Sequence, residues 1–343
     1  MIQNTFPYCC CKLHTLYFIT GLIHAFLAAV TMIVAIVFEC IPSVRLAHVI
    51  TPVTQTIGLW TDSSQIHSSR SLGHNATLDS KCQYAGPSPS RMNDVSIVPV
   101  VLSYGELKTQ FMIPSFFLLS ALFQCSYPII WAFSGRQGSH WSHDYYKELD
   151  DGKIHKAHFI EYSLSASLMM LIIYAQLGIT DLSVLALSFT ATWACMMFGL
   201  LAELFSEVKI NLEIFVFRII AIPAQFIAHG CGWVVLFVTI SVAISGIQNY
   251  ITCVDGYRLP DFVMPIVAIE VILFSSFGIV QAVSLYRMYN LRIAGKHDEG
   301  KTTAADIAYT AEYSYVMLSL LAKTTLALGI FTGLYQTQQS SGN

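Results

Sequence analysis

Charged residues are scarce in this sequence. Asp, Glu, Lys and Arg make up 11% of its 343 residues, whereas a soluble domain carries about 25%. The formal net charge of −3 leaves no basic excess with which to bind nucleic acid. Apolar residues make up 55% of the chain, and its mean hydropathy is +0.58. This composition excludes an ordinary soluble domain and indicates an integral membrane protein whose main contact is the lipid bilayer.

Several short signatures are also missing. The sequence has no internal repeat, no nucleophile elbow, no phosphate-binding loop and no metal-ligand cluster. We therefore expect neither an enzyme nor a metal site. The N-terminal segment lacks a small-residue cleavage site, and its first apolar run is too long for a signal peptide. We expect that run to be retained as the first membrane helix.

Seven apolar runs are long enough to cross a hydrocarbon core of ~30 Å, which requires about 20 residues each. They cover residues 16–39, 111–133, 157–179, 182–205, 213–244, 262–286 and 308–335. We predict an all-α fold, a single seven-helix membrane domain formed by residues 1–343. A long loop at residues 44–108 joins its first two helices.

Basic residues are distributed unevenly between the two sides of this domain. With a cytoplasmic N-terminus, ten of the eighteen Lys and Arg residues lie on the cytoplasmic side and six lie outside. Five of those six fall in the 44–108 loop, and long loops contribute little to the positive-inside rule. The glycosylation sequon at Asn75 would lie outside, as would Cys82 and Cys253. We predict a cytoplasmic N-terminus and an external C-terminus. A disulfide between the two cysteines and two free thiols both remain open.

One lysine stands within the last apolar run. Lys323 lies in the stretch LSLLAKTTLALGIF, residues 318–331, and mostly apolar residues flank it on both sides. A charged side chain at the centre of a bilayer costs about 3 kcal/mol or more. Such a residue marks either a functional site or a structural ion pair.

A carboxylate and several hydroxyl groups are candidates for the partners of Lys323. Glu161 opens the third run, and Ser165 shares its helix face. Ser319 lies four residues before Lys323, and Glu312 lies about three turns closer to the cytoplasm. An amine in an apolar bundle favours its neutral, nucleophilic form, which reacts with aldehydes to give a Schiff base. Glu161 would be the counterion. Counting from the helix starts places Glu161 nearer the cytoplasm than Lys323, so counting alone does not establish this pair.

The two runs resemble the motifs of the heliorhodopsins. The family pattern Arg-Trp-hydrophobic-Glu-Tyr-Ser, then Ser-Ala-Ser, is matched by His158-Phe159-Ile160-Glu161-Tyr162-Ser163, then Ser165-Ala166-Ser167. The seventh run matches with Glu312, Tyr315 and Leu318-Ser319-Leu320-Leu321-Ala322-Lys323. His24 matches a family histidine, and Phe274 and Phe277 match the two phenylalanines beside retinal. The sequence is identified as a divergent member of that family, of the viral type.

The resemblance implies a light-absorbing protein with all-trans retinal on Lys323, Glu161 as counterion and Ser319 hydrogen-bonded near the Schiff base. It also implies a homodimer and a slow photosensor. We expect an unnamed cytoplasmic signalling partner, in the plasma membrane of a host cell or in a viral membrane. Two positions depart from the family pattern. His158 replaces an arginine, and Gln124 replaces the histidine that handles protons with His24, so proton handling remains open.

Further residues have two interpretations each. Trp193, Met196 and Trp233 either contact retinal or form ordinary helix packing. Glu203 and Glu270 either extend a proton relay with Glu161 and Glu312 or are structural and solvated groups. A relay would make the protein a light-gated passive proton channel, which is our alternative to a sensor. A seven-helix receptor or transporter without retinal is the more distant alternative.

Overall fold

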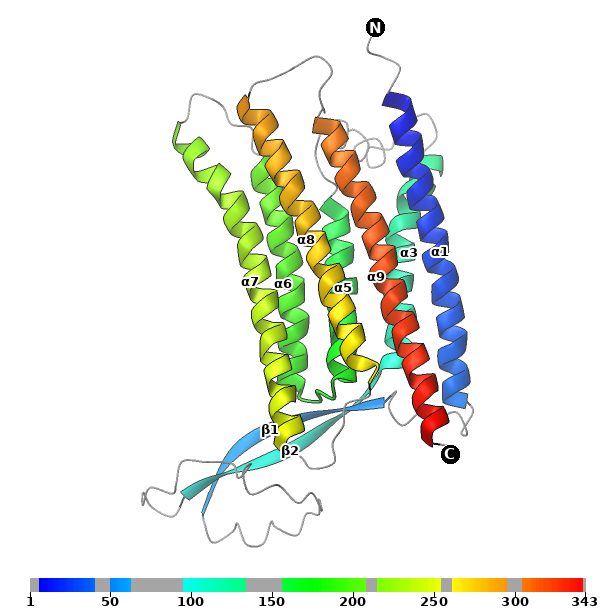
Figure 1. Cartoon of the computed structure of the whole chain (residues 1–343), viewed down its shortest axis with the longest axis vertical. Coiled ribbons are helices and arrows are strands. Elements are labelled where there is room, and N and C mark those ends of the chain that lie inside the picture. The colour runs from blue at the N-terminus through cyan, green and yellow to red at the C-terminus, as the bar shows by residue number, and fades with distance from the viewer. Residues whose placement is uncertain are drawn as a thin grey trace.

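The computed structural model of the protein describes residues 6–40, 50–62, 95–133, 156–207, 215–253, 261–294 and 304–341. Seven long helices in these ranges stand side by side (Figure 1). They are α1 (Phe6–Cys40), α3 (Thr109–Phe133), α5 (Lys156–Gln176), α6 (Leu182–Glu207), α7 (Phe215–Cys253), α8 (Val263–Ala294) and α9 (Ala304–Ser341). Each packs on the next along the chain, and α9 closes the ring against α1.

All seven helices contain a segment that is long and apolar enough to cross a membrane. The predicted seven-helix membrane fold is therefore confirmed. Six of the seven helices are longer than the predicted runs, whereas α5 ends at Gln176 rather than at residue 179. The end of α7 is Cys253 rather than residue 244, and α8 ends at Ala294 rather than at residue 286. Hydropathy detects only the part of a helix that crosses hydrocarbon, whereas its backbone hydrogen bonds continue into the polar turns beyond.

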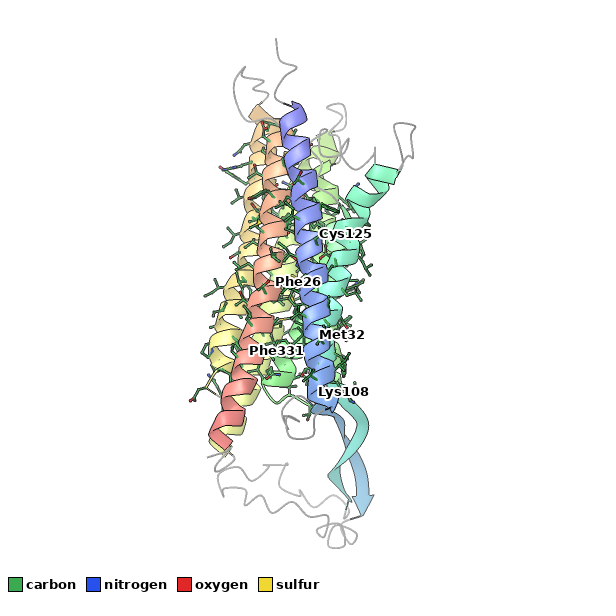
Figure 2. All side chains as sticks on the ribbon, turned by 90° about the vertical axis from the view of Figure 1, so that its right-hand side faces the viewer. Phe26, Met32, Lys108, Cys125 and Phe331 are labelled. Atoms are coloured by element: carbon green, nitrogen blue, oxygen red, sulfur yellow. The ribbon has the colours of Figure 1, made fainter. Side chains whose placement is uncertain are left out.

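The outer faces of the helices are apolar. On α1, Phe26 points away from the bundle (Figure 2) and is 66% exposed. Ile33 on the same helix and Leu122 on α3 are similarly exposed. Such a surface would be unfavourable in water but is the ordinary lipid-facing surface of a membrane bundle.

The long loop between α1 and α3 contains a hairpin that the sequence analysis did not predict. Strand β1 (Ile50–Asp62) pairs antiparallel with β2 (Val95–Lys108), and β2 leads directly into α3. The register shifts between Val53 and Thr54, as at a β-bulge. Both segments are rich in β-branched residues, which favour strands. That enrichment could have predicted the hairpin, but a search for membrane-spanning runs passes over it.

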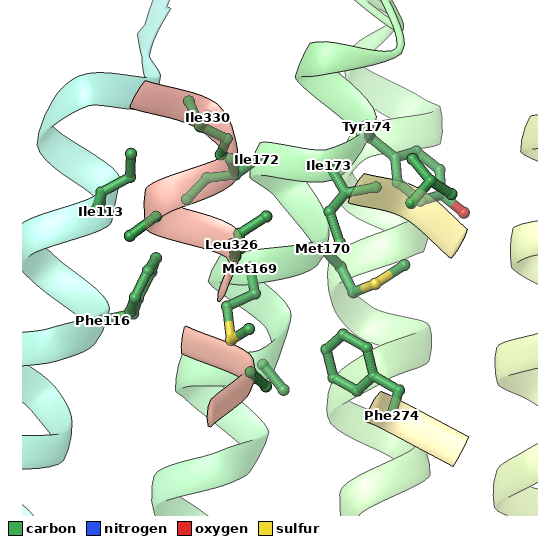
Figure 3. Close-up of a cluster of buried hydrophobic side chains, with 14 of the residues drawn as sticks. Ile113, Phe116, Met169, Met170, Ile172, Ile173, Tyr174, Phe274, Leu326 and Ile330 are labelled. Atoms are coloured by element: carbon green, nitrogen blue, oxygen red, sulfur yellow. The ribbon is translucent and has the colours of Figure 1, made fainter. Parts of the chain in front are cut away.

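The two ends of the bundle differ in the character of their interior. We call the end where α1 begins the N-terminal end and the end that carries β1 and β2 the hairpin end (Figure 1). Toward the hairpin end the core is a cluster of apolar side chains, the hairpin-side cluster (Figure 3). Its fully buried members include Phe116, Ile172, Leu326 and Ile330. Many buried polar side chains, among them the Glu312 carboxyl, lie instead between the middle of the bundle and the N-terminal end.

Candidate functional site

Lys323 lies on α9 in the middle of the bundle, with its side chain only 2% exposed. Its Nζ donates hydrogen bonds to Oε1 of Glu161 at 3.0 Å and to Oγ of Ser319 at 2.8 Å. It also donates to the hydroxyl of Ser120 on α3. The ring of Tyr162 lies beside it, with its centroid 5.3 Å from Nζ. A buried ammonium is thus surrounded by one carboxylate, two hydroxyl groups and an aromatic ring, which supply both charge balance and hydrogen bonds.

The pairing of Lys323 with Glu161 depends on an offset between their helices. Lys323 is residue 20 of α9, whereas Glu161 is residue 6 of α5. At 1.5 Å per residue this difference corresponds to about 21 Å along parallel helices. The start of α9 lies farther out than that of α5 at the N-terminal end (Figure 1), which reduces the difference. The lysine side chain also leans back toward the start of its own helix.

A second polar cluster lies closer to the N-terminal end of the bundle than Lys323 does. Nδ1 of His158 lies 3.1 Å from Oε1 of Glu312, so α5 and α9 are joined there. The hydroxyl of Tyr17 on α1 donates to the other oxygen of Glu312 at 3.0 Å. The structure therefore brings His158 and Glu312 together. Sequence reasoning missed Tyr17, which stands in the first apolar run without any distinguishing pattern.

His24 and Gln124 form a third contact, between α1 and α3. Nδ1 of His24 lies 3.0 Å from Oε1 of Gln124, and both side chains are buried. Gln124 is one turn from Ser120 on α3, the residue that accepts from Lys323. The i, i+4 spacing of Ser120 and Gln124 was the available sequence signal for Ser120. With these two residues, α3 faces the lysine with a polar stripe.

An apolar space extends from Lys323 between the helices. One cavity is lined by Lys323 and Ser319 together with Ser165, Ala166, Met169 and Ala322. A second cavity reaches Trp233 and Leu236 on α7. The two share part of their walls, formed by Tyr162, Met196, Phe274 and Phe277. A primary amine therefore lines one of two adjoining cavities, and the residues that the two cavities share are mainly aromatic and apolar.

This arrangement can be compared with known families. A family model described as Heliorhodopsin matches residues 71–335, more than three quarters of the chain. The chain belongs to the heliorhodopsin family. No curated protein matches it. The family implies a retinal chromophore, and the residues of this heliorhodopsin fit that group. Lys323 offers the amine, Glu161 the negative charge, and the shared aromatic walls an apolar lining for a polyene.

Other residues that the sequence analysis singled out lie apart from Lys323. Trp193 is 44% exposed on the outer face of α6 and does not line either cavity. This placement does not fit contact with a chromophore, whereas Met196 and Trp233 do line the pocket. Cys82 is outside the described residues, as is the side chain of Cys253, so the disulfide remains a prediction.

The two extra carboxylates of the heliorhodopsin have different surroundings. Oε1 of Glu203 on α6 accepts from Nε2 of Gln281 at 3.3 Å. Glu270 on α8 is 1% exposed, and neither of its carboxyl oxygens has a hydrogen-bond partner among the described residues. It lines a small cavity beside Tyr174 and Phe274, within the hairpin-side half of the bundle. Gln281 was not identified from the sequence, because a single glutamine in an apolar run has no distinctive spacing.

Proposed function

We propose that this heliorhodopsin is a light sensor in which all-trans retinal is bound to Lys323 as a Schiff base and Glu161 is the counterion. The observation that carries the proposal is the buried Lys323–Glu161 pair, with 3.0 Å between Nζ and Oε1, beside the cavity with aromatic walls. Retinal supplies absorption of visible light and a change of shape on isomerisation. The remaining roles belong to side chains of the protein.

Three kinds of residue support this role. The free ammonium of Lys323 donates to Glu161, Ser120 and Ser319. A protonated Schiff base keeps a single N–H, which can donate to one of these acceptors at a time, and Glu161 balances its positive charge. Phe274 and Phe277 exclude water from the pocket. A buried positive charge without such partners would be strongly destabilised, so these residues favour a protonated linkage over a neutral one in the dark.

The asymmetry of the interior supports a sensor rather than an open ion path. The hairpin-side cluster (Figure 3) packs apolar side chains between the helices toward the hairpin end. A proton crossing this region would lose its hydrogen-bonding partners, which costs several kcal/mol. The cluster around Glu312 lies on the opposite side of Lys323. Charge shifts at the linkage are therefore expected to be felt mainly toward the N-terminal end.

The first experiment is a visible absorption spectrum of the purified protein with all-trans retinal. We expect a visible band in the wild type and none in Lys323→Ala. Lys323→Arg is the matched control, because its guanidinium keeps the charge beside Glu161 but forms no Schiff base with retinal. If Lys323→Arg folds but lacks the visible band, the band of the wild type is due to the primary amine of Lys323. A wild type without any band would contradict the proposal and favour a receptor or transporter without retinal.

Passive proton transport under light is a second candidate, and Glu270 is the observation that favours it. This carboxyl group is buried without a partner in the apolar half of the bundle, where a relay would need an intermediate site. This second candidate predicts photocurrents that reverse with the proton gradient under voltage clamp and that Glu270→Gln abolishes. Glu270→Asp, which retains the carboxyl group, is the control. Currents unchanged in Glu270→Gln would remove Glu270 from the path.

The assembly and orientation of the protein are part of the proposal. We infer a homodimer, a cytoplasmic N-terminus and a cytoplasmic signalling partner, in the plasma membrane of a host cell or in a viral membrane. The family membership and the charge distribution of the loops support these inferences. Protease protection of tags fused to each terminus tests the orientation, and crosslinking in membranes tests the dimer.

A further inference from the structure

Glu270 on α8 differs from the other buried carboxyl groups of this heliorhodopsin. The carboxyl groups of Glu161, Glu203 and Glu312 each accept at least one hydrogen bond. Both oxygens of Glu270 are buried, and neither has a hydrogen-bond partner among the described residues. A buried polar group without a hydrogen bond is destabilising, and most such groups in native structures have a partner. The partner of Glu270 is therefore expected to be a group from outside the chain.

The described walls around Glu270 supply no such partner. Glu270 lines a cavity whose other residues are apolar or aromatic, and Tyr174 on α5 is the one described wall residue with a hydroxyl group. That hydroxyl donates to the backbone carbonyl of Thr239 on α7 at 3.0 Å. Elsewhere α7 and α8 do pair their polar groups, since Nδ1 of His229 lies 3.0 Å from Oε1 of Gln281. At Glu270 they instead border a space whose described walls are apolar except for its carboxyl group.

The cavity at Glu270 adjoins the two cavities described above. Phe274 lines all three, and it lies one turn from Glu270 on the same face of α8. On α7, Leu236 lines the second cavity and Ile240, one turn further, lines the cavity at Glu270. Lys323 lines the first cavity from the side of α9. Because retinal would be attached there through its aldehyde carbon, we expect its ring at the other end of the molecule, on the α7–α8 side that Glu270 borders.

The size of the cavity at Glu270 limits what can bind there. Its volume is about 20 Å³, and a water molecule needs about 10–15 Å³, so the space holds one small polar group but no lipid chain. A metal ion would need several oxygen, nitrogen or sulfur ligands, whereas the described walls offer one carboxyl group. A hydroxyl group both donates and accepts hydrogen bonds. It can therefore pair with the carboxyl group whether or not the acid carries its proton.

We propose that Glu270 is a specificity-determining residue for the chromophore, because its carboxyl group binds a hydroxyl group on the ring of the retinal. The preferred ligand class is then an all-trans retinal with a hydroxylated ring. The ring would lie against the apolar walls near Phe274, and its hydroxyl group would occupy the small cavity and supply the hydrogen bond that Glu270 lacks. This inference rests on the attachment of retinal to Lys323 proposed above, but it does not depend on whether protons cross the membrane.

Competition between two chromophores tests this preference. The full chain, purified without chromophore, is incubated with equal concentrations of all-trans retinal and all-trans 3-hydroxyretinal, and a second experiment uses 4-hydroxyretinal. Hydroxylamine then releases the bound chromophores as oximes, and chromatography measures their ratio. Glu270→Leu, which offers the ring an apolar wall, gives the reference ratio. Since one net hydrogen bond corresponds to a factor of about three to ten, we expect the wild type to be enriched by that factor in at least one hydroxyretinal.

Glu270→Gln is the matched control for this competition. Its amide still donates and accepts hydrogen bonds, so it should retain an enrichment over Glu270→Leu. A wild type whose ratio equals that of Glu270→Leu with both hydroxyretinals overturns the proposal. This result would mean that the space beside Glu270 holds water or stays empty.

Infrared spectroscopy provides a second readout that does not require the Glu270→Leu variant to fold. The difference between the wild type and Glu270→Gln identifies the carboxyl vibration of Glu270. We expect this vibration to change frequency when bound retinal is replaced by the preferred hydroxyretinal, and an unchanged frequency with both hydroxyretinals overturns the proposal. A wild type that forms a visible band with retinal but shows no preference contradicts the role of Glu270 alone. A wild type that forms no band with any of the three chromophores contradicts the Schiff base at Lys323.

Discussion

Replacing Glu161 by glutamine leaves the ammonium of Lys323 buried without a full negative charge. The two charges are 3.0 Å apart, and at an effective dielectric constant of about 20 their attraction is about 5.5 kcal/mol. Removing one member of a buried ion pair typically costs ~3–5 kcal/mol of stability, because the other charge stays buried. We therefore expect Glu161→Gln to lower the free energy of unfolding by about 3–5 kcal/mol. Lys323→Met, which leaves the carboxylate unpaired, should cost a similar amount.

The double variant makes this prediction specific to the pair. Glu161→Gln/Lys323→Met removes both charges and keeps the side-chain volumes, and such exchanges are often neutral or stabilising by ~1–4 kcal/mol. Reversible unfolding of the protein without retinal measures all three variants, with the lipid-facing Leu321→Met as a control. The double variant should be more stable than either single variant. Costs that simply add, or single variants that lose less than about 1 kcal/mol, would refute the reasoning.

Three further perturbations follow from the packing of the bundle. Phe116→Ala removes a fully buried ring from the hairpin-side cluster and should lower the free energy of unfolding by about 3–5 kcal/mol; a loss below about 1 kcal/mol would mean that the cluster is not closely packed. Tyr17→Phe removes the hydroxyl donated to Glu312 and should cost about 1.5–3 kcal/mol in the same assay, whereas no loss would show that water replaces it. Gly278→Ala places a methyl group where the indole of Trp233 lies, so the visible absorption band should shift. Trp193→Leu changes a side chain on the outer face of α6 and should leave the band in place. The opposite pattern would reverse the assignment of the two tryptophans.

Hydropathy was sufficient to predict the helices, and their order agrees with the structure. The free-energy cost of a polar group in hydrocarbon is large enough that each span must be a continuous apolar run. The same cost made Lys323 conspicuous and required a partner for it. Lys323 was therefore recognisable from the sequence as a residue that needs a partner, and Glu161 as a candidate for it. The resemblance to the heliorhodopsin motifs, rather than hydropathy, joined the two in one site.

The relative depth of the helices could not be predicted in the same way. Hydropathy locates a span to within a turn or two, but a hydrogen bond requires agreement within a fraction of an ångström. At the N-terminal end α9 begins farther out than α5 (Figure 1). This lead of α9 decides whether Lys323 lies at the same depth as Glu161 and can form a hydrogen bond with it. That lead depends on how polar turns outside the hydrocarbon pack. It has no signature in either helix taken alone.

The rotation of each helix was similarly hidden. Trp193 and Met196 lie three residues apart on α6, yet only Met196 lines the pocket. An apolar residue is equally favourable toward lipid and toward a protein core, so periodicity does not distinguish the two faces. Polar residues are more informative because they avoid lipid. Gln281 and His229 could have marked the inward faces of α8 and α7.

The distribution of polar groups has a consequence for signalling. When a charge changes near Lys323, the range of its electric field depends on the dielectric constant of the surroundings. Apolar side chains screen that field only weakly. Toward the hairpin end, the hairpin-side cluster consists of apolar groups that cannot reorient around a new charge. On the opposite side, Glu312 joins α1, α5 and α9 through Tyr17 and His158. These hydrogen bonds can be exchanged or broken, so a charge change at the linkage has responsive partners mainly on that side. If retinal binds Lys323 as proposed, the N-terminal ends of α1, α5 and α9 are where a change of helix position should be sought.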